Sequence, residues 1–204
     1  MKTDQINAVS NKLSKKLQSL FLIKRNVNVV PSLTNNDIKI GNPPKGQIKF
    51  VYVGGTSKWQ CIEEIFQIYK LINKNYNSSI TFYVKNNEII EDFSEKYRIK
   101  AKCKYVEHKN IDRELRKYDF GFLIRENNII NQVSSPVKFL EYISNGVIPI
   151  MTDNIGDYSK EVIEKQIGVI VKYNQYDKIN NKIQKVLNSK NIYERMKKYA
   201  KKKT

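Results

Sequence analysis

Arg125 and Lys138 are the residues of this 204-residue chain whose types and positions best suit the binding of an anion. Arg125 directly follows an apolar run, Phe120–Ile124, which is short enough for a buried strand. An arginine at the end of a strand presents a planar fork that matches phosphate oxygens. Lys138 would lie in the first turn of a helix, where the backbone carries partial positive charge, so a lysine disfavours the helix unless it meets an anion.

The elements that must position these side chains form one unit over residues 119–151. Ser134, Ser135 and Pro136 look like a helix start, because serine favours the N-cap and proline the first helical position. Gly146 would end that helix, since glycine tolerates left-handed dihedrals at C′. The expected parts are a strand, a polar loop, a helix and a second strand, at Phe120–Ile124, Arg125–Ser134, Pro136–Asn145 and Val147–Met151. This order is typical of a parallel α/β sheet.

Residue types alone leave two interpretations of these charges open. In the first, Arg125 and Lys138 bind phosphate where helix N-termini meet the carboxyl ends of strands. In the second, the helix is simply solvated, with an incidental Lys138–Glu141 pair and an exposed loop cation at Arg125.

A second candidate phosphate contact is the turn at Gly54 and Gly55. It follows an expected strand, Ile48–Val53, and precedes an expected helix from about Gln60 to Lys74. Glycines in such a turn let backbone N–H groups approach a phosphate closely. A Gly-Gly turn is a weak signal by itself, because most such turns are only tight connections.

Residues 135–142, SPVKFLEY, and 145–150, NGVIPI, resemble the signature of the nucleotide-sugar-binding half of retaining GT-B glycosyltransferases of family 4. The resemblance implies a Rossmann-like doubly wound parallel sheet. It also implies that Glu141 holds the ribose hydroxyls of the donor nucleotide. The backbone at Ser135 and Pro136 would meet the diphosphate.

The same resemblance assigns expected contacts on the other side of the site. It implies that the turn at Gly54 and Gly55 touches the donor diphosphate and that the loop at Val106 contacts the nucleobase. The family usually carries two basic residues in the turn region. Here Gly55 stands where arginine is common and Gln60 lies near the usual lysine, so Lys58 is expected to substitute.

The chain departs from the family's motif of two glutamates eight residues apart. Val133 stands where the first glutamate is expected, while Glu141 matches the second. This chain instead resembles a subgroup of the family whose sequences contain Arg-Glu, then Asn, then Ser-Pro-x-Lys. The matching residues here are Arg125, Glu126, Asn131 and residues 135–138. In that subgroup, loop residues would take over the sugar and phosphate contacts. Arg125, Lys138 and Lys58 are thus the expected catalytic residues, stabilising the charge on the leaving diphosphate.

The order of expected elements divides the chain into three parts, residues 1–40, 45–190 and 191–204. Residues 1–31 resemble the last βα unit of an acceptor-binding domain, and Thr34–Gln47 has the composition of a linker. The first part should contain strands at Gln5–Val9 and Asn26–Val30 around a helix from Ser10 to about Leu20. Further strands are expected at Ser79–Val84, Cys103–Val106 and Gly168–Val171, and further helices at Asn87–Tyr97, Asn110–Lys117, Tyr158–Lys165, Tyr176–Leu187 and Ile192–Lys203.

The composition of the chain indicates which kinds of partner and cofactor it favours. The net charge of +17 favours anionic partners, but the basic residues are spread out, and only the C-terminal lysines form a dense cluster. Peripheral contact with an anionic membrane is expected as a secondary property. The two cysteines and the single histidine, His108, form no metal or redox motif, and GT-B transfer implies no metal cofactor. The N-terminus lacks an apolar signal region, which favours a cytoplasmic location, peripheral at the inner face of the membrane.

Three functions follow from these observations. The first is a donor-binding domain that transfers a sugar from a nucleotide sugar to a glycan or lipid-linked acceptor, in cell-surface polysaccharide synthesis, with a separate acceptor-domain chain as a partner. The second is a basic module that binds nucleic acid or a membrane surface. No nucleic-acid-reading motif supports it. The third is a nucleotide-sugar epimerase of GT-B fold, left open by the missing first glutamate.

Overall fold

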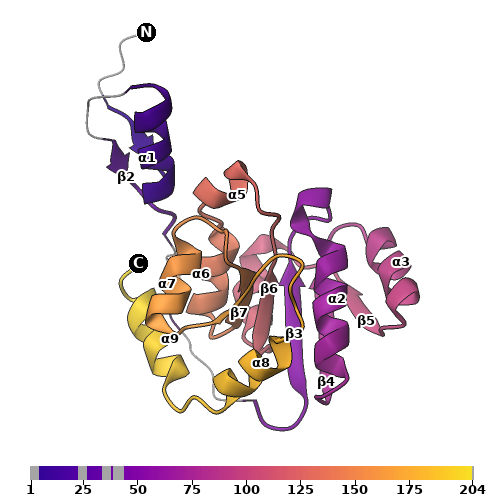
Figure 1. Ribbon diagram of the computed structural model, residues 1–204. Coiled ribbons are helices and arrows are strands. Elements are labelled where there is room, and N and C mark those ends of the chain that lie inside the picture. Colours follow the sequence, from indigo (N-terminus) through magenta and orange to yellow (C-terminus); the bar gives the residue numbers. More distant parts are fainter. Residues whose placement is uncertain (1–4, 23–26, 34–37, 39–43, 204) are drawn as a thin grey trace.

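The computed structural model describes residues 5–22, 27–33, 38 and 44–203. Within these residues, six strands form one parallel sheet in the order β5-β4-β3-β6-β7-β8 (Figure 1). Their bounds are Ile48–Val53 (β3), Ser78–Tyr83 (β4), Ala101–Lys104 (β5), Phe120–Leu123 (β6), Ile148–Thr152 (β7) and Val169–Val171 (β8). Numbered from β3, this is the strand order 3-2-1-4-5-6 of the doubly wound Rossmann fold. The predicted fold class is confirmed.

The central strands are largely apolar because helices cover both faces of the sheet. Every residue of β6 and β7 is buried. Phe50 of β3 stacks on Phe120 of β6, with ring centroids 5.2 Å apart, and meets Tyr69 edge-on at 5.6 Å. These contacts place the centre of the core at the crossover between the two halves of the sheet.

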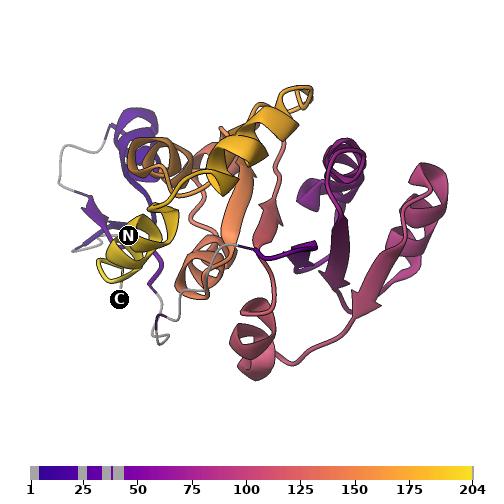
Figure 2. The same ribbon diagram turned by 90° about the horizontal axis from the view of Figure 1, so that it is seen from below.

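Helices lie on both sides of the sheet (Figure 2). On one side, α2 packs against α8, and the amide of Asn180 donates to the carbonyl of Leu71. On the opposite side lie α4 and α6. The bounds are Ile62–Asn73 (α2), Glu88–Tyr97 (α3), Ile111–Leu115 (α4), Ile129–Val133 (α5), Val137–Ser144 (α6), Tyr158–Lys165 (α7), Ile179–Leu187 (α8) and Ile192–Ala200 (α9).

Three local predictions were wrong near the site. The helix expected from Gln60 begins at Ile62, because Cys61 adopts a left-handed conformation with φ 54° after a short 3₁₀ turn. The expected polar loop contains α5, whose N-cap Asn128 accepts from the Asn131 N–H. Pro136 is the N-cap of α6 and not its first residue, so no serine hydroxyl caps this helix.

Other strand and helix ends also differ from the prediction. The strand expected at Cys103–Val106 lies at Ala101–Lys104, α4 ends at Leu115 and α8 begins at Ile179. The C-terminal end of α6 agrees with the prediction, since Gly146 has φ 74° and the Val147 N–H donates to the carbonyl of Tyr142.

The N-terminal segment forms a small βαβ unit of its own (Figure 1). β1 (Asn7–Ala8) pairs in parallel with β2 (Asn28–Val29), and α1 (Asn11–Leu20) connects them. The hydroxyl of Ser10 accepts from the Leu13 N–H, as its predicted N-cap role requires, and donates to the carbonyl of Val133. Most of the predicted linker, Thr34–Gln47, lies outside the described residues.

The C-terminal helix α9 belongs to the packing of the main domain. It packs against α6, and Tyr199 meets Phe139 edge-on with ring centroids 5.9 Å apart. Met196 and Ala200 are buried on the same side of the helix. Among the residues the structure describes, no helix has both the length and the apolar character needed to cross a membrane.

Candidate functional site

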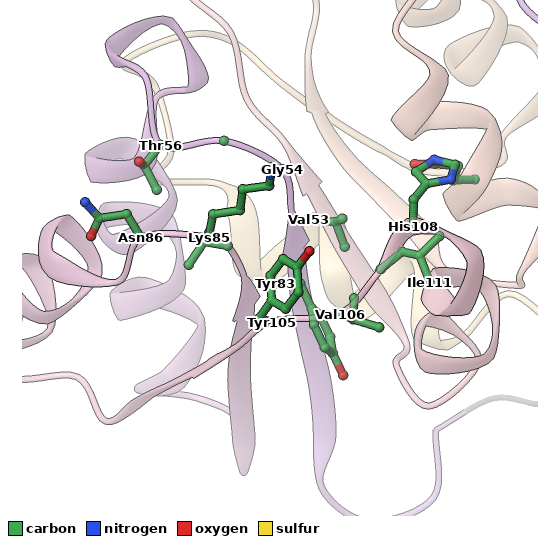
Figure 3. Close-up of a pocket in the computed structure, with 13 residues that line it drawn as sticks. Val53, Gly54, Thr56, Tyr83, Lys85, Asn86, Tyr105, Val106, His108 and Ile111 are labelled. Atoms are coloured by element: carbon green, nitrogen blue, oxygen red, sulfur yellow. The ribbon is translucent and has the colours of Figure 1, made fainter.

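A cleft of about 530 Å³ lies at the carboxyl ends of β3, β4 and β5. Figure 3 shows its side chains around the space between the end of β3 and the turn that carries His108 and Ile111. The lining residues come from the ends of these strands, the start of α4 and the polar side of α6: Val53, Gly54, Gly55, Thr56, Tyr83, Val84, Lys85, Asn86, Tyr105, Val106, His108, Ile111 and Glu141. The position is that of ligand sites in open α/β sheets, and the volume suits a small organic ligand.

The Gly54–Gly55 turn forms the inner wall of this cleft. The Gly54 N–H donates to the carbonyl of Tyr83 over 3.1 Å, which continues the β3–β4 ladder into the turn. Gly54 has φ +140°, a conformation that side chains rarely allow. A Cβ at Gly54 would lie 2.9 Å from Nζ of Lys138, so the absent side chain makes room for this ammonium.

Lys138 reaches Gly54 from the first turn of α6. Its Nζ lies 4.1 Å from the centroid of the Tyr52 ring and donates to Oε1 of Gln60 over 3.3 Å. Tyr52 is fully buried, and its phenol donates to the carbonyl of Gly55 and to Oε1 of Gln60, over 2.6 and 2.9 Å. The ammonium is therefore held between an aromatic face and an amide oxygen, beside the cleft.

Arg125 joins the same cluster from the end of β6, although it is only 5 % exposed. Its Nη1 donates to Oε1 of Gln60 over 2.6 Å and to the carbonyl of Trp59 over 3.4 Å. The guanidinium carbon lies 4.5 Å from the centroid of the Trp59 ring, a cation–π contact. The Arg125 N–H donates to the hydroxyl of Thr152 at the end of β7, which fixes the backbone.

The two cations carry uncompensated positive charge. Among the described residues, neither Arg125 nor Lys138 forms an ion pair with a carboxylate. Burial lowers the pKa of Lys138 well below its ordinary value, and the neighbouring Arg125 lowers it further, while Glu141 acts in the opposite direction. Burial also lowers the pKa of Arg125. A bound anion would relieve both effects, because opposite charge favours the protonated forms.

Glu141 lies one turn further along α6 and lines the cleft. Its side chain is 13 % exposed, and its Oε1 lies 3.2 Å from Nε2 of His108, whose side chain is 88 % exposed. Val106 lines the same cleft near the exposed ring of Tyr105. The structure thus brings Gly54, Gly55, Glu141 and Val106 around one space, and their binding of a nucleotide stays a prediction.

Three expected site residues lie elsewhere. The hydroxyl of Ser135 accepts from the Ser32 N–H over 3.4 Å and lies 3.0 Å from the hydroxyl of Tyr158, so this side chain joins the N-terminal unit to the domain. Neither Ser135 nor Pro136 lines the cleft. Lys58 is exposed and lines a neighbouring depression that meets the cleft at Thr56. Lys58 is thus not part of the cluster of Arg125 and Lys138.

Sequence reasoning missed the residues that hold the cations together. Gln60 appeared only as a departure from a basic position, and Tyr52 only as part of an apolar strand. Trp59 carried no signal beyond being the one tryptophan of the chain. His108 entered the sequence analysis only as part of no metal motif, and its exposed ring lies 3.2 Å from Oε1 of Glu141.

In the described part of the chain, no three His, Cys, Asp or Glu side chains gather as a metal site. Whether transfer proceeds without a metal stays a prediction. The buried groups of the cluster are an amide, a phenol and two cations, and such a set favours anions over metal ions.

Residues 34–203 match the family model described as glycosyl transferases group 1, and the chain therefore belongs to that family. Among curated proteins, none matches the chain at a significant level.

Solved structures of glycosyltransferases share the fold. WaaG, a glycosyltransferase involved in lipopolysaccharide biosynthesis, matches with a TM-score of 0.75 at 12 % identity, over 97 % of this chain and 58 % of WaaG. TarM from S. aureus, in complex with UDP, matches with a TM-score of 0.69 at 13 % identity, over 98 % of this chain and 40 % of TarM. The catalytic domain of cholesterol-alpha-glucosyltransferase from Helicobacter pylori matches with a TM-score of 0.59 at 16 % identity, over 76 % of this chain and 96 % of that domain. The chain therefore spans little more than half the length of WaaG.

Proposed function

We propose that this chain is the donor-binding, C-terminal half of a retaining GT-B glycosyltransferase of family 4. The observation that carries the proposal is the cleft at the carboxyl ends of β3, β4 and β5, with Glu141 on its wall, Lys138 beside Gly54, and Arg125 linked to Lys138 through Gln60. Its volume of about 530 Å³ is adequate for a nucleotide. Family membership and the shared fold support a transferase.

The geometry suggests which residues would contact each part of the bound donor. The base would lie by Val106 and the exposed ring of Tyr105, and the carboxylate of Glu141 would accept hydrogen bonds from the ribose hydroxyls. The diphosphate would then lie along the Gly54–Gly55 turn, next to Lys138. Cations at this place stabilise the charge that develops on the leaving diphosphate.

The acceptor side of the reaction lies beyond this domain. The N-terminal βαβ unit docks on the main domain through three hydrogen bonds, from Ser10 to Val133 at the end of α5, from Asn11 to Asp157 just before α7, and from Ser32 to Ser135, and an acceptor-binding half would join here. We propose a glycan or lipid-linked acceptor, cell-surface polysaccharide synthesis and a cytoplasmic site at the inner face of the membrane. WaaG, which acts in lipopolysaccharide biosynthesis, supports this proposal through its fold. The acceptor-binding half would be part of a longer chain or a separate partner.

Calorimetric titration with UDP, GDP, ADP and the matching nucleotide sugars tests the donor proposal. Saturable binding of one nucleoside diphosphate, with discrimination among bases, is the expected result. Addition of EDTA should leave that binding unchanged, in keeping with a metal-free donor site. Binding of all polyanions alike, with a steep dependence on salt, would instead indicate a general basic surface.

A further inference from the structure

The side-chain oxygen of Gln60 is the common acceptor of the cation cluster. Oε1 receives hydrogen bonds from Nη1 of Arg125 at 2.6 Å, the phenol of Tyr52 at 2.9 Å and Nζ of Lys138 at 3.3 Å. Only the oxygen end of the amide can occupy this place, because the nitrogen end would point donors at two cations. Gln60 is 7 % exposed, so its orientation is set by these partners.

A neutral acceptor has a particular effect at this position. A carboxylate between two buried cations would form ion pairs with them and would lower the net positive charge of the cluster. An amide oxygen satisfies hydrogen-bond donors of both groups without neutralising either one. The three hydrogen bonds to Gln60 thus leave the cluster without an internal counter-ion, and its positive charge stays available to a ligand.

Trp59 fixes the guanidinium of Arg125 from the solvent side. Its ring lies 4.5 Å from the guanidinium carbon, and its carbonyl accepts from Nη1. The ring is 53 % exposed, which is unusual for the one tryptophan of a chain with an apolar core. Residues 58–60 form a 3₁₀ turn that ends at Cys61 with φ 54°, and this turn places Trp59 outward and Gln60 inward.

We propose that Gln60 and Trp59 are positioning residues that hold Arg125 and Lys138 as an uncompensated cation pair for the donor diphosphate. The inference rests on the proposed function for the identity of the ligand. It explains how the turn region can bind a diphosphate without its usual basic residues. The positive charge comes from Arg125 after β6 and from Lys138 on α6. Gln60, near the position of the usual lysine, accepts hydrogen bonds from both.

The decisive variant is Gln60→Glu, which keeps the shape of the side chain and supplies a carboxylate. The new carboxylate should pair with Arg125 and Lys138, so the melting temperature should stay equal or rise. Affinity for inorganic pyrophosphate should fall about tenfold or more, because the carboxylate takes the place of the ligand's charge. A merely structural role would not move stability and affinity in opposite directions.

Gln67→Glu is the matched control. Gln67 lies on α2, where its amide donates to the phenol of Tyr97, away from the cluster. The change in net charge is the same, so Gln67→Glu should bind pyrophosphate like the unchanged protein.

Two further measurements complete the test. Pyrophosphate should change the emission of Trp59 in the unchanged protein, and the same concentration should give no change in Gln60→Glu. Trp59→Leu, at an exposed position, should fold normally and lower pyrophosphate affinity several-fold by calorimetry.

Equal pyrophosphate affinity in Gln60→Glu and the unchanged protein would overturn the inference, and so would a lack of pyrophosphate binding by the unchanged protein. In either case, selective binding of a nucleoside diphosphate would leave the proposed function standing. Failure of every nucleotide would remove that function too.

Discussion

The ammonium of Lys138 fills the space that a side chain on residue 54 would need. A Cβ built on Gly54 would lie 2.9 Å from Nζ of Lys138 and 3.3 Å from the phenol oxygen of Tyr52. The φ of +140° favours a glycine at this position, and a side chain there would displace the end of Lys138. Gly55, the next residue, has no described atom within 4 Å of its missing Cβ.

Gly54→Ala and Gly55→Ala should therefore behave differently. Gly54→Ala should lower the free energy of unfolding by about 1–3 kcal/mol, because an alanine at positive φ is strained. It should also weaken diphosphate binding by displacing Lys138. Gly55→Ala should change the free energy of unfolding by no more than about 0.5 kcal/mol. Urea denaturation of both variants checks this, and equal losses would contradict the assigned role of Gly54.

Glu141→Ala should weaken binding of the nucleoside diphosphate by about 1–3 kcal/mol, because it removes a charged hydrogen-bond acceptor. The loss should be confined to ligands with ribose hydroxyls. A 2′,3′-dideoxy analogue should bind the variant and the unchanged protein alike. Calorimetry with both ligands measures the difference, and unchanged affinity for the natural nucleotide would remove Glu141 from the site.

His108→Ala tests whether His108 competes with the ligand for Glu141 or contacts the ligand itself. Because Nε2 lies 3.2 Å from Oε1 of Glu141, this side chain competes with a ribose for the carboxylate. Nucleotide affinity should stay equal or rise slightly in the variant. A drop of tenfold or more, about 1.4 kcal/mol, would instead show that His108 contacts the ligand directly.

Binding of a diphosphate should take up a proton at Lys138. Burial and the neighbouring Arg125 lower the pKa of this group well below its ordinary value. A bound anion raises the pKa again, and affinity should therefore increase as the pH falls through the range between the two values. Calorimetry in two buffers of different ionisation enthalpy measures the proton uptake. The titration is done at about pH 8, because the second ionisation of a phosphate, with a pKa of about 6, is complete there. Lys138→Met should abolish the uptake.

Asp157 should hold the N-terminal unit on the main domain. Its carboxylate accepts from the Asn11 and Lys12 N–H groups at 2.6 and 3.3 Å, and so caps α1 from a distant part of the chain. Asp157→Ala should weaken this attachment by about 1 kcal/mol, the usual value of an N-cap. Hydrogen exchange should then speed up in residues 5–33 and stay unchanged in β3 and β6. Asp153→Ala, at an exposed residue, is the control, and equal effects would argue against the cap.

The strand and helix pattern could be predicted from local sequence. Apolar runs such as Phe120–Ile124 indicate strands buried on both faces, and Gly146 marks a helix end through its backbone freedom alone. The placement of Glu141 on the cleft wall follows from the same pattern, because helices that follow parallel strands start at one edge of the sheet.

Only the tertiary structure determined which side chains meet. Gln60 and Arg125 are 65 residues apart, and Gln60 and Lys138 are 78 apart, so no local pattern could join them. The left-handed Cys61 turns Gln60 inward, while Ser135, next to Pro136 in the sequence, turns toward Ser32 and away from the cleft. Local propensity determines the elements, but burial and the need to satisfy each buried donor decide which residues form the site.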